Sequence, residues 1–60
     1  MSLIVRVEQR GNSVRAYGAG NCFLWARNGQ LISYTATEVS IYEAGTVYVY
    51  NERGHVIRRG

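Results

Sequence analysis

The sequence contains no proline, no lysine and no aspartate, and it has only one cysteine and one histidine. A single cysteine excludes a disulfide within the chain, and one cysteine with one histidine excludes a closed four-ligand zinc site. No apolar run approaches the roughly 18 residues that span a bilayer, and Leu3-Ile4-Val5 is too short for a signal-peptide core. We therefore expect no metal, no cofactor and no membrane partner, and a cytoplasmic location, with which a lone cysteine agrees.

The chain has 60 residues, which predicts one small domain spanning residues 1–60. A domain this small buries only about 60% of the surface that its unfolded chain exposes, so its stability is marginal. The 47% of apolar residues excludes a disordered chain. Because disulfides and metals are excluded as additional stabilisation, we expect the chain to form a homo-oligomer.

Charge is sparse and unusual in kind. Only 18% of the residues are charged, the seven basic residues are all arginine, and the four acidic residues are all glutamate. The formal net charge of +3 and the pI of about 9.5 favour anionic partners without requiring them.

Turn residues and period-two alternation of apolar side chains predict an all-β fold. We expect strands at about 3–8, 13–18, 22–27, 30–36, 38–43, 46–50 and 55–59. Asn28-Gly29 favours a two-residue type I′ hairpin, because both residue types accept a positive φ. Connections this short join only antiparallel neighbours, so the sequence predicts an antiparallel meander of six to seven short strands, with a small barrel as one means of closure.

One segment admits two interpretations. Thr35-Ala36-Thr37-Glu38 fits a helix capping box, and Ala44-Gly45 would end a short helix. The β-branched and aromatic residues between them favour a strand at 38–43 instead.

An internal repeat relates residues 14–33 to residues 39–58 at a fixed offset of 25, without a gap. The identical positions are Val14 and Val39, Tyr17 and Tyr42, Ala19-Gly20 and Ala44-Gly45, Gly29 and Gly54, and Ile32 and Ile57. Two copies are too few for a solenoid. We interpret them as a duplicated unit of three strands; a chance match in a short, biased sequence is the alternative.

The strand faces are apolar on both sides. Alternation predicts that Phe23 and Trp25 share one face, with Cys22 and Leu24 on the other. A lone chain of this size cannot easily cover both faces, so either the sheet curls into a barrel or an aromatic face meets another chain. Six aromatic residues at repeat-equivalent positions are the predicted interface or stacking surface: Tyr17, Phe23, Trp25, Tyr42, Tyr48 and Tyr50.

Catalysis is poorly supported by the sequence, and we expect no enzyme. Cys22 aligns with Val47 in the second copy, which predicts a small core side chain, and His55 follows a turn glycine. The four glutamates are scattered, and Gly18-Ala19-Gly20 lacks the third glycine of a dinucleotide fingerprint.

Two functions of different class remain. The first is a non-enzymatic binding or assembly module that acts as a homo-oligomer. The alternative is a protein that binds single-stranded nucleic acid on a sheet surface of aromatic and arginine side chains, because arginine binds phosphate and aromatic rings stack on bases. The candidate anion-binding residues are Arg15, Arg27, Arg53, Arg58 and Arg59.

Overall fold

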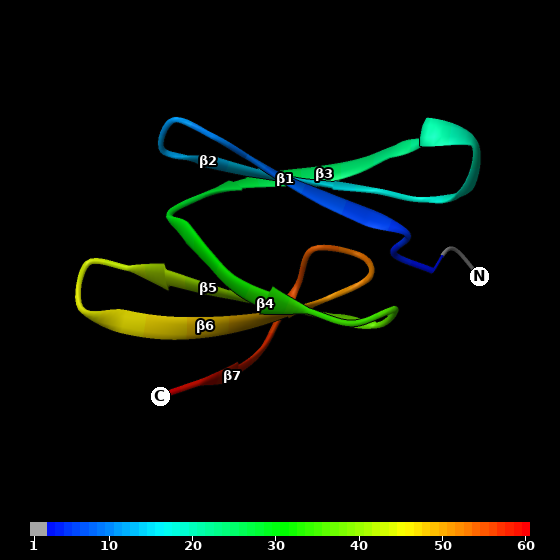
Figure 1. Cartoon of the computed structure of the whole chain (residues 1–60). Coiled ribbons are helices and arrows are strands. Elements are labelled where there is room, and N and C mark those ends of the chain that lie inside the picture. Colours follow the sequence, from blue (N-terminus) through cyan, green and yellow to red (C-terminus); the bar gives the residue numbers. More distant parts are fainter. Residues whose placement is uncertain (1–2) are drawn as a thin grey trace.

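A computed structural model describes residues 3–60, and in this range seven strands follow one another along the chain (Figure 1). They are β1 (Arg6–Arg10), β2 (Ser13–Tyr17), β3 (Phe23–Asn28), β4 (Gln30–Tyr34), β5 (Glu38–Glu43), β6 (Thr46–Asn51) and β7 (Val56–Arg59). A 3-10 turn (Ala19–Asn21) lies between β2 and β3. The all-β class is confirmed, and the contested segment at 38–43 is a strand.

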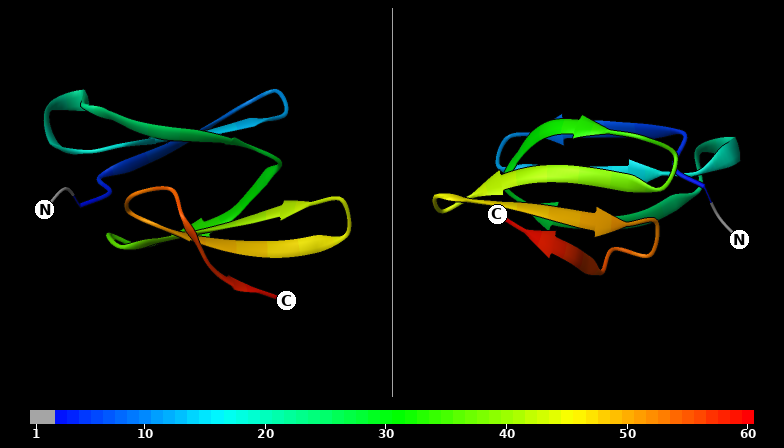
Figure 2. Two further views of the ribbon diagram at one scale, coloured as in Figure 1. Left: turned by 180° about the vertical axis from the view of Figure 1, so that it is seen from behind. Right: turned by 90° about the horizontal axis from the view of Figure 1, so that it is seen from below.

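The strands form two antiparallel sheets that face each other as two layers (Figures 1 and 2). Sheet A has the order β1-β2-β3, and sheet B has the order β4-β5-β6-β7. Within each sheet every strand pairs with its neighbour in the sequence. The predicted antiparallel meander is therefore confirmed, and it folds as a two-layer sandwich of separately hydrogen-bonded sheets.

The predicted hairpin at Asn28-Gly29 is wrong, because the chain passes from sheet A to sheet B there. Gly29 is buried with a φ of 132°, and a Cβ at this position would lie 2.5 Å from Ile41 Cγ2. Only glycine lets the backbone bend this close to the opposite layer. The two-residue turn with two positive φ values is instead Ala44-Gly45, at 51° and 83°, between β5 and β6.

The core lies between the sheets, and most of its residues occupy positions that the repeat relates to one another. Besides Ile4, the buried side chains of its main cluster form three pairs related by the offset of 25: Val14 with Val39, Ala16 with Ile41, and Trp25 with Tyr50. Each pair contributes one residue from sheet A and one from sheet B. Strand for strand, β2, β3 and β4 correspond to β5, β6 and β7, but the turns differ, since β3 leads into the other sheet whereas β6 leads into a hairpin with β7.

One side of the sandwich is joined by a glutamine side chain. Gln9 Oε1 accepts a hydrogen bond from the Leu31 backbone N–H at 2.6 Å, and Gln9 Nε2 donates to the Gly29 carbonyl at 2.9 Å. The amide of Gln9 thereby takes the place of a backbone peptide group between β1 and β4. A second connection joins the segment before β1 to the segment after β4, where the Ile4 N–H donates to the Ala36 carbonyl at 2.7 Å.

On the other side, the turn between β6 and β7 covers the indole of Trp25. Gly54 is buried, and a Cβ there would lie 2.8 Å from Trp25 Cγ. Arg27 Nη2 donates to the Gly54 carbonyl at 2.8 Å, which fixes this turn against sheet A. The ring centroids of Trp25 and Tyr50 are 5.4 Å apart, so both large side chains are covered within one chain.

Candidate functional site

The six aromatic residues that the sequence predicts as one surface are divided among three environments. Trp25 and Tyr50 are buried in the core at 6% exposure, and Tyr48 is half-buried against them. Tyr42 is exposed on sheet B, whereas Tyr17 and Phe23 lie on the outer face of sheet A. Trp25 is therefore covered within one chain, and no second chain is required to bury it.

A β-bulge explains why Phe23 and Trp25 do not share a face, contrary to the prediction. Ala16 pairs with Trp25 and Tyr17 pairs with Phe23, so Leu24 is an extra residue in β3. Leu24 joins Trp25 in packing toward the core, and the alternation is shifted by one position. Phe23 is thereby turned outward, with 55% of its surface exposed.

On the outer face of sheet A, one side chain from each strand forms a row, which we call the Arg6–Tyr17–Phe23 row. Arg6 lies opposite Tyr17, and Tyr17 lies opposite Phe23. The Arg6 guanidinium carbon is 4.4 Å from the centroid of the Tyr17 ring, within the range of a cation–π contact. The Tyr17 and Phe23 rings meet edge to face, with centroids 5.9 Å apart. The row presents a cation, a half-buried ring and an exposed ring side by side.

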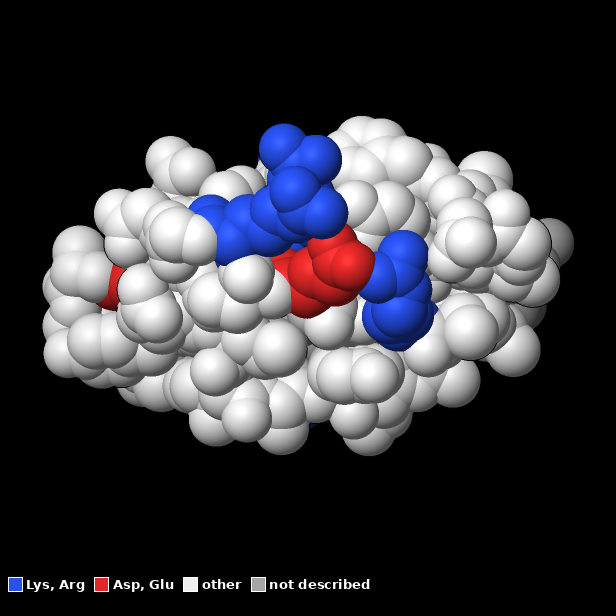
Figure 3. Space-filling view, turned by 45° about the horizontal axis from the view of Figure 1, so that its top comes forward, with Lys and Arg blue, Asp and Glu red and all other residues white. Residues whose placement is uncertain are grey.

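Next to this row, basic side chains surround one carboxylate, as the space-filling view shows (Figure 3). Glu8 accepts hydrogen bonds from Arg6 Nη1 and, at 3.3 Å, from Arg10 Nε. Arg15 is the cross-strand neighbour of Glu8 and so lies on the same face. Within residues 3–60, Arg15 makes no ion pair. We call these four residues the Glu8 cluster; it has three positive charges and one negative charge.

The electrostatics of the cluster keep Glu8 ionised. Desolvation acts to raise the pKa of Glu8, but the hydrogen bonds and charges of Arg6 and then Arg10 outweigh it and lower that pKa below its usual value. At neutral pH the Glu8 carboxylate is therefore negatively charged and paired with Arg6 and Arg10.

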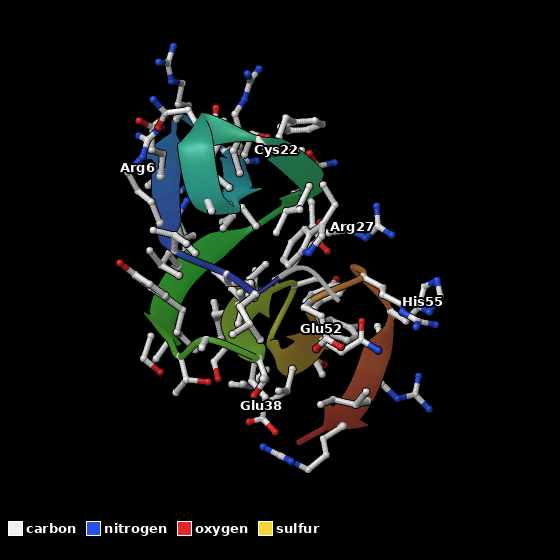
Figure 4. All side chains as sticks on the ribbon, turned by 90° about the vertical axis from the view of Figure 1, so that its right-hand side faces the viewer. Arg6, Cys22, Arg27, Glu38, Glu52 and His55 are labelled. Carbon is white, nitrogen blue, oxygen red and sulfur yellow. The ribbon has the colours of Figure 1, made fainter. Side chains whose placement is uncertain are left out.

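The other predicted anion-binding residues are not part of this face. Arg58 pairs with Glu38 at 3.1 Å. Arg27 is committed to the Gly54 carbonyl, with its guanidinium carbon 5.7 Å from the Tyr50 ring centroid. Figure 4 shows Arg27 on one side of the ribbon and Arg6 on the other. Arg53 is exposed in the β6–β7 turn, and Arg59 is exposed at the end of β7. Of the five predicted arginines, the structure brings only Arg15 to the Glu8 cluster.

The alternation of charged residues in β1 indicates a charged strand face that was not among the sequence-based predictions. Arg6, Glu8 and Arg10 alternate with Val7 and Gln9, so a period-two pattern places the three charged residues on one face. Comparing this pattern with the alternation in residues 13–17 would have brought Arg15 and Tyr17 to the same face.

Cys22 is exposed, so its predicted burial in the core is wrong. The connection between β2 and β3 is longer than the Ala44-Gly45 turn. Cys22 therefore lies in this connection, just before β3, whereas its repeat counterpart Val47 lies within β6. His55 lies in the β6–β7 turn, and Figure 4 shows it well apart from Cys22.

Across residues 3–60, no three His, Cys, Asp or Glu side chains gather where they could hold a metal ion. The same range contains no helix of the length and apolar character needed to cross a bilayer. No family model, no curated protein and no solved structure matches this chain.

Proposed function

We propose that this chain is a non-enzymatic binding module whose ligand is single-stranded nucleic acid, held on the outer face of sheet A. The Arg6–Tyr17–Phe23 row beside the Glu8 cluster is the observation that supports this proposal. It combines, on one exposed face, the two groups that such a ligand requires, which are aromatic rings for the bases and arginines for the phosphates.

The exposed ring of Phe23 offers a face on which an unpaired base can stack. Stacking requires only the π-face that every base has, so we expect binding with little sequence preference. The arginine guanidinium group suits the backbone because its planar fork matches the oxygens of a phosphate. A duplex offers no unstacked base to Phe23, so single strands are the preferred form.

The test is fluorescence anisotropy of a labelled oligothymidylate titrated with the protein at several salt concentrations. We expect the logarithm of the affinity to fall with the logarithm of the salt concentration by about 0.7 for each phosphate contacted. Phe23→Leu should weaken binding by about 5- to 150-fold, since base stacking on one ring contributes about 1–3 kcal/mol.

Tyr42→Leu is the matched control, because Tyr42 is an exposed aromatic residue on the opposite sheet. Its affinity should equal that of the wild type. An equal effect of both substitutions, or binding that does not respond to salt, would refute the proposed surface.

Assembly into a homo-oligomer is a second candidate, supported by the edge of sheet B. β7 is the last strand of its sheet, and its Val56 and Ile57 are 48% and 43% exposed. An unpaired edge strand with apolar side chains is a site where another chain can add. Sedimentation equilibrium of the wild type and of Ile57→Thr tests this; a wild type that remains monomeric at the highest concentration rejects it.

The exposed, unpaired thiol of Cys22 suits a reducing compartment such as the cytoplasm, which is the location we propose.

A further inference from the structure

The Glu8 carboxylate occupies a position that resembles a bound phosphate. Both of its oxygens are used, one by Arg6 and the other by Arg10. Arg15 is the cross-strand neighbour of Glu8 and lies on the same face, without an ion pair to the carboxylate. A carboxylate and a phosphate accept the same paired hydrogen bonds from guanidinium groups, so a group of arginines arranged around one is arranged for the other.

We propose that Glu8 marks a phosphate subsite formed by Arg6, Arg10 and Arg15, and that a backbone phosphodiester of the nucleic acid displaces its carboxylate on binding. This inference rests on the proposed function and adds to it the place of the phosphate, the residues that hold it and a competitor within the chain itself.

Arg6 connects the subsite to the stacking surface. It is the one residue that belongs to both the Glu8 cluster and the Arg6–Tyr17–Phe23 row. The row crosses three adjacent strands, which lie about 4.8 Å apart. A phosphate held at Arg6 on β1 therefore leaves its nucleotide free to extend over Tyr17 toward Phe23 on β3, so the ligand runs across the strands.

Because Glu8 already engages the arginines, an anion binds at this subsite only if its own contacts outweigh those of the carboxylate that it displaces. While the Glu8 carboxylate is charged, it engages two of the three arginines and cancels one of the three positive charges, so a single weakly held anion gains little by displacing it. A polyanion that also stacks on Phe23 gains affinity from both contacts. The cluster thus favours a nucleic-acid strand over small anions, which supply charge without a base.

The experiment compares Glu8→Gln with Glu52→Gln, using labelled oligothymidylate as the probe. Both substitutions remove one negative charge, but Glu52 lies in the β6–β7 turn, apart from Arg6 of the Glu8 cluster (Figure 4). We expect Glu8→Gln to tighten binding about tenfold or more, the effect of one charge-assisted hydrogen bond transferred to the ligand. Its salt dependence should steepen by at most about 0.7, the value for one additional phosphate contact. Glu52→Gln should change the affinity by less than about twofold.

A double-mutant cycle separates displacement from a general charge effect. Arg10→Gln should weaken binding little in the wild type, where Glu8 already engages Arg10, and markedly more in the Glu8→Gln background. Circular dichroism confirms that each variant is folded.

The outcomes distinguish this inference from the proposed function. If the wild type binds but Glu8→Gln binds no more tightly than Glu52→Gln, the phosphate subsite is refuted and the nucleic-acid surface stands. If neither the wild type nor Glu8→Gln binds the probe, both are refuted. Tighter binding by Glu8→Gln, with the coupling to Arg10, supports the subsite.

Discussion

Gly54 and Gly45 form a matched pair for testing how the β6–β7 turn contributes to the core. Both have a φ of 83°, so replacement by alanine imposes the same backbone strain at each. They differ in their surroundings. A Cβ at Gly45 meets nothing within 4 Å, whereas a Cβ at Gly54 would lie 2.8 Å from Trp25 Cγ and 3.1 Å from both Trp25 Cβ and Cδ1.

The difference in stability follows from this geometry. A side chain in the left-handed region costs about 1–2 kcal/mol, which is the whole effect that we expect for Gly45→Ala. Gly54→Ala carries that strain and also forces the turn or the indole to move, at a further cost of about 1–3 kcal/mol. The indole has little freedom to retreat, because it packs against Tyr50. We therefore expect a total loss of about 2–5 kcal/mol for Gly54→Ala, a large part of the roughly 3–9 kcal/mol of a domain this size.

Urea unfolding followed by far-UV circular dichroism measures both losses, and the fluorescence of Trp25 reports the local change. Gly54→Ala should shift the emission of the folded state, and Gly45→Ala should leave it unaltered. Replacing Trp25 by alanine should reduce the difference between the two glycine variants, because it removes Cγ and Cδ1, two of the three atoms that a Cβ at Gly54 would meet. Equal losses for the two variants, with unchanged emission, would refute the close packing of this turn on Trp25.

Three further predictions follow from burial. Trp25→Ala should cost about 3–5 kcal/mol at every protein concentration, as urea midpoints over a concentration series will show, because the indole is covered within one chain. Cys22→Ser should change the free energy of unfolding by less than about 0.5 kcal/mol in the same assay, because this thiol is exposed. Burial raises the pKa of Tyr50, so the neutral phenol is favoured in the fold; the stability it contributes is present below about pH 10 and is lost as the pH rises through the folded-state pKa. Tyr50→Phe should therefore lose less stability than the wild type in urea titrations at alkaline pH.

The local features of the sequence predict the strands well and their assembly less well. Alternation is a property of each strand alone, so seven strands could be expected in the correct order, including 38–43. The first is displaced, because it spans Arg6–Arg10 and not 3–8. The layer change at Gly29 depends on its contact with Ile41, which lies on a strand that is adjacent only in the folded chain. The Asn28-Gly29 pair resembles a hairpin turn because turn preferences depend on the local residues alone. Whether the next strand pairs with β3 or crosses to the other sheet depends on contacts with residues distant in the sequence.

The site shows the same division. The sequence predicts binding roles for Tyr17, Phe23 and Arg15, but it groups them with side chains that the structure places in the core or on the opposite side. A single extra residue, Leu24, separates Phe23 from Trp25. Bulges of this kind have no reliable local signature, because they form where the twist of neighbouring strands requires them. The faces of β3 could therefore not be assigned from its alternation.

The repeat and the proposed site occupy different parts of the molecule. Residues at positions related by the repeat supply most of the core, and among them Trp25 and Tyr50 pack against each other. β1 lies before the first copy, and β4 holds the equivalent place beside β5 in sheet B, but only β1 provides the charged residues Arg6, Glu8 and Arg10. Its addition to sheet A places a charged row beside Tyr17, whereas Tyr42, the repeat equivalent of Tyr17 on β5, has β4 and β6 as its neighbours. Most of the core therefore comes from positions related by the repeat, whereas β1, which precedes them, accounts for the difference between the two outer faces that a specific binding surface requires.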